Sequence, residues 1–333
     1  MSSRISRRAF AAGAAASPIL FKAAASAQTP VATPESDLFA DLSFRPGEID
    51  TPFGVVEFPE NPQKIVVIDD GPLDAALALG VEPIGYTVSS NGETASAYLV
   101  DKVPAESKSV GGWGELNIEE IILLEPDLII DSRWQSEEIV ATLSQIAPVV
   151  IPLTTPAEDP ESLQEWEQEL LGLGHTLGVL HTAKQVVLDS RARGAAIKES
   201  AGDKVGQSVV VFRPQPEFPV VMSHDWITGR VLTWCGFVGN DLTENVEPPH
   251  TGDTVSLEML NLLEADWLFA AARTDDMAAA LDNYLDNQGF QMITAVKNDQ
   301  VHLVAGDLWS GTIGVLATHA LMDDIERIII NGQ

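Results

Sequence analysis

The stretch Asn117–Ile130, N-I-E-E-I-I-L-L-E-P-D-L-I-I, has a second copy at Ser256–Phe269, S-L-E-M-L-N-L-L-E-A-D-W-L-F. Aligned without gaps, the copies share these residues: Glu119/Glu258, Leu123/Leu262, Leu124/Leu263, Glu125/Glu264 and Asp127/Asp266. Each copy opens with a good helix-capping residue and continues as a short amphipathic helix. Each then turns at an acidic residue into an apolar run typical of a buried parallel strand. The repeat predicts two similar α/β lobes, and its long period indicates duplicated domains rather than a solenoid.

The rest of the chain alternates strand and helix patterns on both sides of this repeat. The first half has strand patterns at 64–69, 83–87, 127–131 and 148–152, and helix patterns at 73–79 and 136–146. The second half has strand patterns at 208–212 and 301–305, and helix patterns at 226–236, 275–285 and 311–330. Such alternation predicts parallel sheets with helices on both faces. Two long helices are expected between the halves, at 161–178 and about 181–200, and the second of these is the only expected connection between lobes.

The first 27 residues have the pattern of an export signal. Ser6–Phe10, S-R-R-A-F, matches the twin-arginine motif, and Ala25–Ala27, A-S-A, matches a signal-peptidase site. An ordinary secretory signal with an accidental arginine pair is the alternative, and both place the product in the periplasm or elsewhere outside the cytoplasm. We therefore expect a signal peptide at 1–27, a flexible tether at 28–43, an N-terminal lobe at 44–181, a linker helix at 182–201 and a C-terminal lobe at 202–333.

The charge and cysteine content narrow the class of protein. The chain has 19 bases, 49 acids and a formal charge of −30, and removing a signal with four bases and no acids makes this −34. Such a charge argues against nucleic acid or an anionic membrane as a partner. It also opposes an anionic ligand and so favours a neutral or cationic one. The single cysteine, Cys235, excludes a disulfide within the chain, and the signal offers no cysteine for a lipid anchor.

Five segments in this order resemble the iron–siderophore group of the helical-backbone solute-binding proteins of ABC importers. They are I-V-V-I-D-D-G-P-L-D-A-A-L-A-L-G-V-E-P-I-G at 65–85, V-G-G-W-G-E-L-N-I-E-E-I-I-L-L-E-P-D-L-I-I at 110–130, V-L-T-W-C-G-F-V-G at 231–239, V-S-L-E-M-L at 255–260, and the closing helix after D-L-W-S-G at 307–311. The resemblance implies two Rossmann-like lobes joined by a single long helix, with the ligand between them. It implies a monomer that captures a ferric siderophore and delivers it to an importer permease, touching the membrane only through that complex.

Two other classes of function remain open. Haem and cobalamin are alternative ligands on the same fold, and an exported enzyme or chaperone on a Rossmann-like scaffold is a more distant alternative. The chain has no G-x-S-x-G motif, P-loop or complete dinucleotide fingerprint, which argues against an enzyme. No cofactor is expected, because iron would enter only as part of the chelate.

The resemblance also implies a role for the two matching glutamates. In this family a glutamate at the position of Glu119 and of Glu258 docks onto arginines of the permease. The alternative is that each acid only complements the dipole of its helix, and both roles are compatible.

Candidate ligand residues are those that follow strand ends, because ligands of open α/β sheets bind beyond the carboxyl ends of the strands. Guanidinium groups suit the oxygen-rich surface of a ferric chelate, and indoles suit its apolar faces. We expect Arg133 and Arg213 to face each other from opposite lobes, although pairing with a protein carboxylate is the alternative for each arginine. The full set is Asp70, Tyr86, Trp113, Arg133 and Trp134 in the first lobe, and Arg213, Trp226, Arg273 and Trp309 in the second. The six histidines have no metal-binding spacing, so no bare-metal site is expected.

Overall fold

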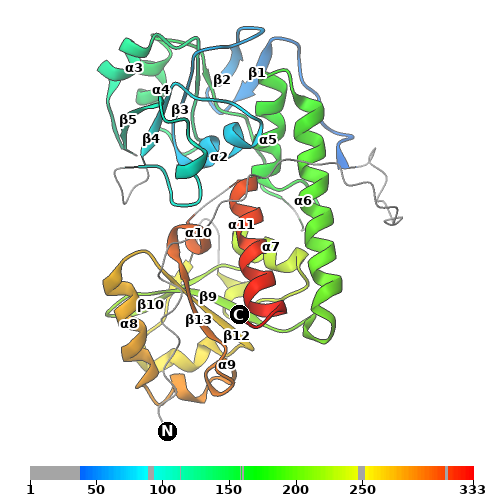
Figure 1. The fold of residues 1–333 in the computed structure, drawn as a ribbon, viewed down its shortest axis with the longest axis vertical. Coiled ribbons are helices and arrows are strands. Elements are labelled where there is room, and N and C mark those ends of the chain that lie inside the picture. Colours follow the sequence, from blue (N-terminus) through cyan, green and yellow to red (C-terminus); the bar gives the residue numbers. More distant parts are fainter. Residues whose placement is uncertain are drawn as a thin grey trace.

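Two sheets, one in each half of the chain, are joined by the 22-residue helix α6 (Leu180–Ala201). The computed structural model describes residues 38–88, 94–112, 114–157, 159, 161–246, 252–311 and 314–333. The expected signal peptide, most of the tether and Trp113 therefore lie outside the described residues. In Figure 1 the N-terminal lobe lies above the C-terminal lobe, and α6 runs along one side of both. The predicted fold class is confirmed: an α/β protein of two lobes with one long connecting helix.

The N-terminal lobe has a six-stranded sheet in the order β6-β5-β4-β3-β7-β8, parallel except for β6. Its central strands are fully buried runs of branched residues, as expected for a sheet covered on both faces. The strands are β3 (Ile65–Val67), β4 (Gly85–Val88), β5 (Lys108–Gly112), β6 (Glu115–Leu116), β7 (Leu128–Ile130) and β8 (Val149–Val150). The helices are α2 (Asp70–Ala78), η2 (Val100–Lys102), α3 (Ile118–Leu124), α4 (Glu137–Leu143) and α5 (Glu165–Thr176).

The C-terminal lobe has a five-stranded sheet in the order β11-β10-β9-β12-β13, in which β10 runs antiparallel to both of its neighbours. The strands are β9 (Val209–Pro214), β10 (Pro219–Met222), β11 (Gly252–Thr254), β12 (Trp267–Ala272) and β13 (Val301–Ala305). The α-helices are α7 (Ile227–Trp234), α8 (Asp275–Leu285), α9 (Thr294–Lys297), α10 (Gly306–Ser310) and α11 (Val315–Ile325). The 3₁₀ helices are η3 (Gly202–Lys204), η4 (Thr243–Asn245), η5 (Leu257–Leu263) and η6 (Phe290–Met292), and η7 (Glu326–Ile330) is a π-helix.

The sequence repeat occupies equivalent places in the two lobes, because the aspartate that its two copies share anchors an equivalent strand in each lobe. Asp127 accepts hydrogen bonds from the backbone N–H groups of Gln63 and Lys64, just before β3, at 2.8 and 2.9 Å. Asp266 accepts one from the backbone N–H of Ser208, just before β9, at 2.8 Å. The helices of the two copies differ. α3 is an α-helix capped by Asn117, whereas η5 is a 3₁₀ helix kinked at Met259, and Ser256 makes no side-chain capping bond. Both copies thus form the predicted short helix, but the second is a 3₁₀ helix without the predicted side-chain cap.

A shared helical layer, in addition to α6, holds the lobes together. One continuous core contains residues of α2, α5 and α6 together with residues of α7 and α11. Trp166 of α5 and Trp234 of α7 meet edge to face with ring centroids 6.1 Å apart. Glu167 of α5 is fully buried and receives two hydrogen bonds from Arg191 of α6, at 2.6 and 2.7 Å. These contacts fix the orientation of the linker helix relative to the first lobe.

The N-terminal segment packs against the first lobe earlier in the chain than expected. Phe39, within the range assigned to a flexible tether, is buried, and the ammonium group of Lys184 lies 5.0 Å from its ring centroid. The antiparallel hairpin of β1 (Glu48–Thr51) and β2 (Gly54–Glu57) follows, and no sequence pattern predicted it. Within the described part of the chain, no helix has both the length and the apolar content needed to cross a bilayer.

Candidate ligand-binding site

Six side-chain N or O atoms in the described residues are buried without a hydrogen bond, and four of them, in Asp70, Asp131, Arg213 and Arg273, lie within three residues of the carboxyl end of a parallel strand. An unpaired buried polar atom costs about 1–3 kcal/mol, and a ligand that supplies the missing partner would offset this cost. The concentration of such atoms here indicates a site built to bind a polar ligand. The six atoms are Asp70 Oδ1, Tyr98 Oη, Asp131 Oδ2, Arg213 Nε, Trp226 Nε1 and Arg273 Nε.

Two arginines from neighbouring parallel strands form the C-terminal side of this site. Arg213 lies near the end of β9, and Arg273 directly follows β12. The pKa of Arg213 is lowered, first by burial and second by the positive charge of Arg273. Arg273 is held by the carbonyl of Ser310 at 3.2 Å and by a carboxylate oxygen of Asp307 at 3.6 Å. The pair therefore concentrates positive charge at one edge of a strongly acidic protein.

Trp226 lies in the same lobe and follows β10. It caps the N-terminus of α7, and its Nε1 is one of the unpartnered atoms. Two residues later, the hydroxyl of Thr228 donates to the carbonyl of Trp309 in α10 at 3.0 Å. This bond ties the start of α7 to the helix that carries Asp307 and Ser310.

The N-terminal side is acidic and comes from the loop after β3. Asp69 has a φ of 77°, and this turn starts α2 at Asp70. The Asp70 carboxylate accepts a 2.5 Å hydrogen bond from Ser96 through Oδ2, while Oδ1 has no partner. Burial is the main cause that raises the pKa of Asp70, and the carboxylates of Asp69 and Asp307 raise it further. Asp307 belongs to α10 of the other lobe, and α10 lies below α2 in Figure 1. We call Asp70, Ser96, Arg213, Arg273 and Asp307 the interlobe site.

The structure does not bring Arg133 together with Arg213 through any contact. Arg133 makes a two-pronged ion pair with Glu165 of α5, at 2.6 and 3.1 Å, and also donates to the Thr154 hydroxyl at 3.2 Å. Its guanidinium carbon lies 4.7 Å from the ring centroid of Trp134, whose side chain is largely exposed. Arg133 therefore pairs with a protein carboxylate, which was the stated alternative to ligand binding.

Trp309 is a correction to the expected set. It is fully buried, stacks on Phe269 with centroids 4.3 Å apart, and donates through Nε1 to Asp324 at 2.8 Å. The expectation that its indole forms an apolar wall for the ligand is wrong for this structure, because the indole is enclosed by the core of its own lobe. Tyr86 is half-buried in β4 and packs against the main core, so it contributes to packing. Trp113 lies outside the described residues.

Four polar residues near the site were missed by the sequence analysis: Ser96, Tyr98, Asp131 and Asp307. Asp131 is fully buried, and this burial raises its pKa to about 7. The pKa of Tyr98 is raised by burial and by the carboxylates of Asp74 and Asp70. Asp131 directly follows the strand β7, so selecting residues after strand ends should have included Asp131, as it included Asp70. Ser96 and Tyr98 lie far from a predicted strand end, and no sequence signal marked them.

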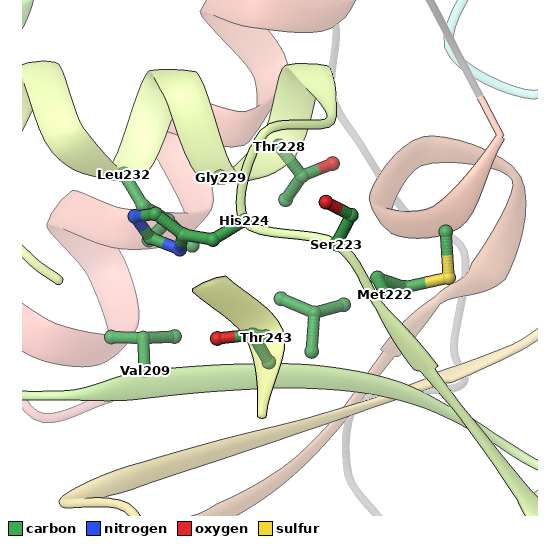
Figure 2. Close-up of a pocket in the computed structure, with 9 residues that line it drawn as sticks. Val209, Met222, Ser223, His224, Thr228, Gly229, Leu232 and Thr243 are labelled. Atoms are coloured by element: carbon green, nitrogen blue, oxygen red, sulfur yellow. The ribbon is translucent and has the colours of Figure 1, made fainter. Parts of the chain in front are cut away.

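A small cavity inside the C-terminal lobe is too small to hold a chelate. Figure 2 shows its lining between α7 and the sheet, including His224, Thr228 and Thr243. Its volume of about 10 Å³ accommodates no more than one water molecule. His224 bonds to the Thr233 hydroxyl at 3.0 Å, and burial lowers its pKa. In the described part of the chain, no cluster of three or more histidine, cysteine or acidic side chains has the geometry of a metal site.

The two matching glutamates lie on exposed surface. Glu119 is in the first turn of α3, and Glu258 is in the first turn of η5. Each is followed four residues later by an exposed leucine, Leu123 at 76% and Leu262 at 38% exposure. The repeat therefore presents an acidic and an apolar side chain on each lobe, away from the buried strands that it anchors.

Comparison with known proteins identifies the family. The model of a periplasmic binding protein family matches residues 65–307, which is most of the chain. The chain belongs to this periplasmic binding protein family. Its relatives in the family are substrate-binding proteins rather than enzymes.

Relatives and solved structures with similar chains agree with this assignment. The chain is 30% identical to the "probable siderophore-binding lipoprotein" YfiY of Bacillus subtilis, over 82% of this chain and 84% of that protein. It is 25% identical to the achromobactin-binding periplasmic protein of Dickeya dadantii, over 80% of this chain and 86% of that one. The structure of Staphylococcus aureus SirA complexed with staphyloferrin B is similar with a TM-score of 0.71 and 24% identity, covering 85% of this chain and 98% of that one. This last likeness shows the shared fold.

Proposed function

We propose that this chain is an exported solute-binding protein that captures a ferric siderophore at the interlobe site and passes it to an ABC importer. The observation that carries the proposal is the set of buried polar atoms without a hydrogen bond on both sides of the site, above all Nε of Arg213. The names of the relatives support a siderophore as the cargo. Haem and cobalamin remain the alternative ligands.

The arginine pair favours a chelate with free carboxylate groups. Two guanidinium groups side by side suit an anion, since each carries a fixed charge and several donors. The net charge of the protein has the opposite effect, but it acts through water and is screened beyond about 8 Å at physiological salt. We therefore propose an anionic chelate in place of the neutral or cationic one that the net charge alone favours. Iron is the cargo and is held by the chelate, so the protein needs no cofactor of its own.

Delivery requires a surface that the importer can recognise, and the repeat supplies two. We assign Glu119 with Leu123 on α3, and Glu258 with Leu262 on η5, to docking against the permease. Two equivalent surfaces fit a partner that itself has two equivalent halves, each with a basic group next to an apolar patch. The export signal at residues 1–27, a twin-arginine signal in our proposal, would bring the protein to the outer face of the membrane where the permease opens.

A titration of tryptophan fluorescence against a panel of ligands tests the proposal. The panel contains ferric citrate, a neutral ferric trihydroxamate, haem and cobalamin. Saturable quenching by ferric citrate or another carboxylate chelate, with weaker response to the others, is the expected result. Binding of haem or cobalamin alone would replace the proposed cargo, and turnover of any of the ligands by the purified protein would favour an enzyme.

A further inference from the structure

A fully buried aspartate of one lobe caps a helix of the other lobe. Asp74 lies on α2, and its two carboxylate oxygens accept the backbone N–H groups of Leu316 and Ala317, each at 2.8 Å. These groups belong to the first turn of α11, whose own N-cap residue, Gly314, has no side chain to offer. The first helical turn of α11 also contains no acid. The negative charge that a helix N-terminus favours therefore comes from Asp74.

The glycine before α11 is required by this arrangement. A Cβ atom at Gly314 would collide with the carboxylate group of Asp74. Any other residue at position 314 would push α2 and α11 apart or displace the carboxylate. The two lobes are therefore complementary at this contact. The N-terminal lobe provides the Asp74 carboxylate, and the C-terminal lobe provides Gly314, which leaves room for it.

This joint lies directly behind the interlobe site. On α2, Asp70 lies one helical turn before Asp74, so the same short helix carries a wall of the site and the capping carboxylate. On the other lobe, α10 with Asp307 and Ser310 lies just before α11 in the chain, and Ser310 holds Arg273. In Figure 1, α2 lies above the upper end of α11, where the lobes meet beside α6. A shift at the joint would therefore move Asp70 relative to Asp307 and Arg273.

The capping carboxylate of Asp74 is fully buried, and burying a charged group costs free energy. Burial raises the pKa of Asp74 to about 7, against the opposing effects of the backbone N–H groups of α11 and of the Tyr98 hydroxyl. A carboxylate that served only the stability of α2 would be more stable facing water. A buried carboxylate at this position is explained if its contact with α11 fixes the relative positions of the two lobes.

We propose that Asp74 is a positioning residue for ligand capture: by capping α11 across the lobe interface, it sets the spacing between the acidic and basic walls of the interlobe site. The inference rests on the proposed function for its ligand, but the spacing itself is measurable without one. The linker helix α6 ties the lobes along one side, and Asp74 ties them in the middle. Together they give the site a fixed width.

Distances between spin labels test this inference. Labels at Gln145→Cys on one lobe and Asn283→Cys on the other, in a Cys235→Ser background, report the interlobe distance by pulsed electron resonance. Both label positions are exposed, and Cys235 is buried. We expect one narrow distance distribution for the parent protein, and a broader or shifted one for Asp74→Ala and for Gly314→Ala. Asp74→Asn, which keeps one acceptor oxygen, should fall between.

A matched control separates positioning from stability. Asp127→Ala also removes a carboxylate with two backbone N–H partners, but both partners lie in its own lobe. It should lower the unfolding midpoint and leave the interlobe distance unchanged. In parallel, the affinity for ferric citrate should fall about tenfold in Asp74→Ala, the scale of a lost helix cap, and stay within about twofold in Asp127→Ala.

Parent-like distance distributions in both Asp74→Ala and Gly314→Ala, measured well below their unfolding midpoints, would overturn the inference. If ferric citrate fails to bind the parent protein, the proposed ligand is at fault, and the distance measurement still decides the role of Asp74. If Asp74→Ala does not fold, Gly314→Ala and Asp74→Asn carry the same test.

Discussion

Arg213 and Arg273 lie beside each other at the carboxyl edge of the C-terminal sheet, close enough that the charge of Arg273 lowers the pKa of Arg213. Neighbouring strands β9 and β12 bring them together, although they are far apart in sequence. Two like charges at short range cost free energy, and Nε of Arg213 is also buried without a hydrogen bond, whereas Nε of Arg273 lies 3.6 Å from a carboxylate oxygen of Asp307. Both costs would be offset by an anionic ligand between them, which is why the pair is the centre of the proposed site.

The first prediction concerns the charge of the ligand. Binding of an anionic chelate such as ferric citrate should weaken as salt is raised from 50 to 500 mM, because the arginine pair attracts it electrostatically. Binding of a neutral trihydroxamate chelate should change little. Calorimetric titrations at both salt concentrations provide the measurement. Equal affinity for both chelates at every salt concentration would show that the arginines do not select for charge.

The second prediction concerns docking. Glu119→Arg and Glu258→Arg should leave ligand affinity within about twofold, since both residues are exposed and neither belongs to the interlobe site. Uptake of radioactive iron by cells that depend on this protein should fall sharply, because each change replaces an attraction with a repulsion. Exposed Glu138→Arg on α4 is a charge-matched control that should retain uptake. Loss of ligand binding in either docking variant would remove it from the docking surface.

The third prediction concerns stiffness. α6, the shared core and the Asp74 cap connect the lobes at several points, so ligand should change the interlobe angle only slightly. Small-angle scattering profiles recorded with and without saturating ligand should nearly superimpose. A decrease in the radius of gyration of several ångströms on binding would mean that the lobes close like those of a flexible-hinge protein.

The fourth prediction concerns pH. Burial raises the pKa of Asp74 and of Asp131 to about 7, well above the unfolded value of 3.8. Between about pH 4 and 7 the folded state therefore binds more protons than the unfolded state, and the free energy of unfolding falls as pH rises through this window. The stabilisation is fully present below about pH 4 and lost above about pH 7. We expect a melting midpoint higher at pH 5 than at pH 8 by on the order of 5 °C.

Repulsion among the many acidic side chains also lowers the free energy of unfolding as pH rises. A variant separates that effect from the titration of Asp74 and Asp131. Asp131→Asn removes a fully buried ionisable group and should flatten the dependence of the melting midpoint on pH. Asp101→Asn changes the charge by the same amount at an exposed position and should leave the slope unchanged. Identical slopes in the parent and in Asp131→Asn would show that Asp131 does not titrate between its folded and unfolded values in this range.

Much of the fold could be predicted because local patterns determine it. The repeat around Asp127 and Asp266 marked one strand in each lobe, and the uninterrupted helix pattern before Ser200 marked the linker helix. The strand β10 and the hairpin of β1 and β2 were missed, because short antiparallel strands depend on pairing with distant residues. The 3₁₀ geometry and the kink at Met259 were also missed.

The site was less predictable than the fold. Strand ends led to Asp70, Arg213 and Arg273, which lie within three residues of strand ends in the two sheets, and their role in ligand binding stays a prediction. The pairing of Arg133 with Glu165 and the burial of Trp309 depend on side-chain packing between elements, which one sequence does not reveal. The cap from Asp74 to α11 joins residues more than 240 positions apart and left no local pattern.

The most direct test of the account is a titration of the arginine variants with a ferric carboxylate chelate. Arg213→Ala and Arg273→Ala should each weaken the binding of ferric citrate by about ten- to a hundredfold, the effect of about 1.5–3 kcal/mol lost with a charge-assisted hydrogen bond. Arg45→Ala removes an equally charged side chain from the exposed edge of the first lobe and should bind like the parent protein. Parent-like affinity in both Arg213→Ala and Arg273→Ala, with the parent protein saturating normally, would contradict the assignment of the ligand to the interlobe site.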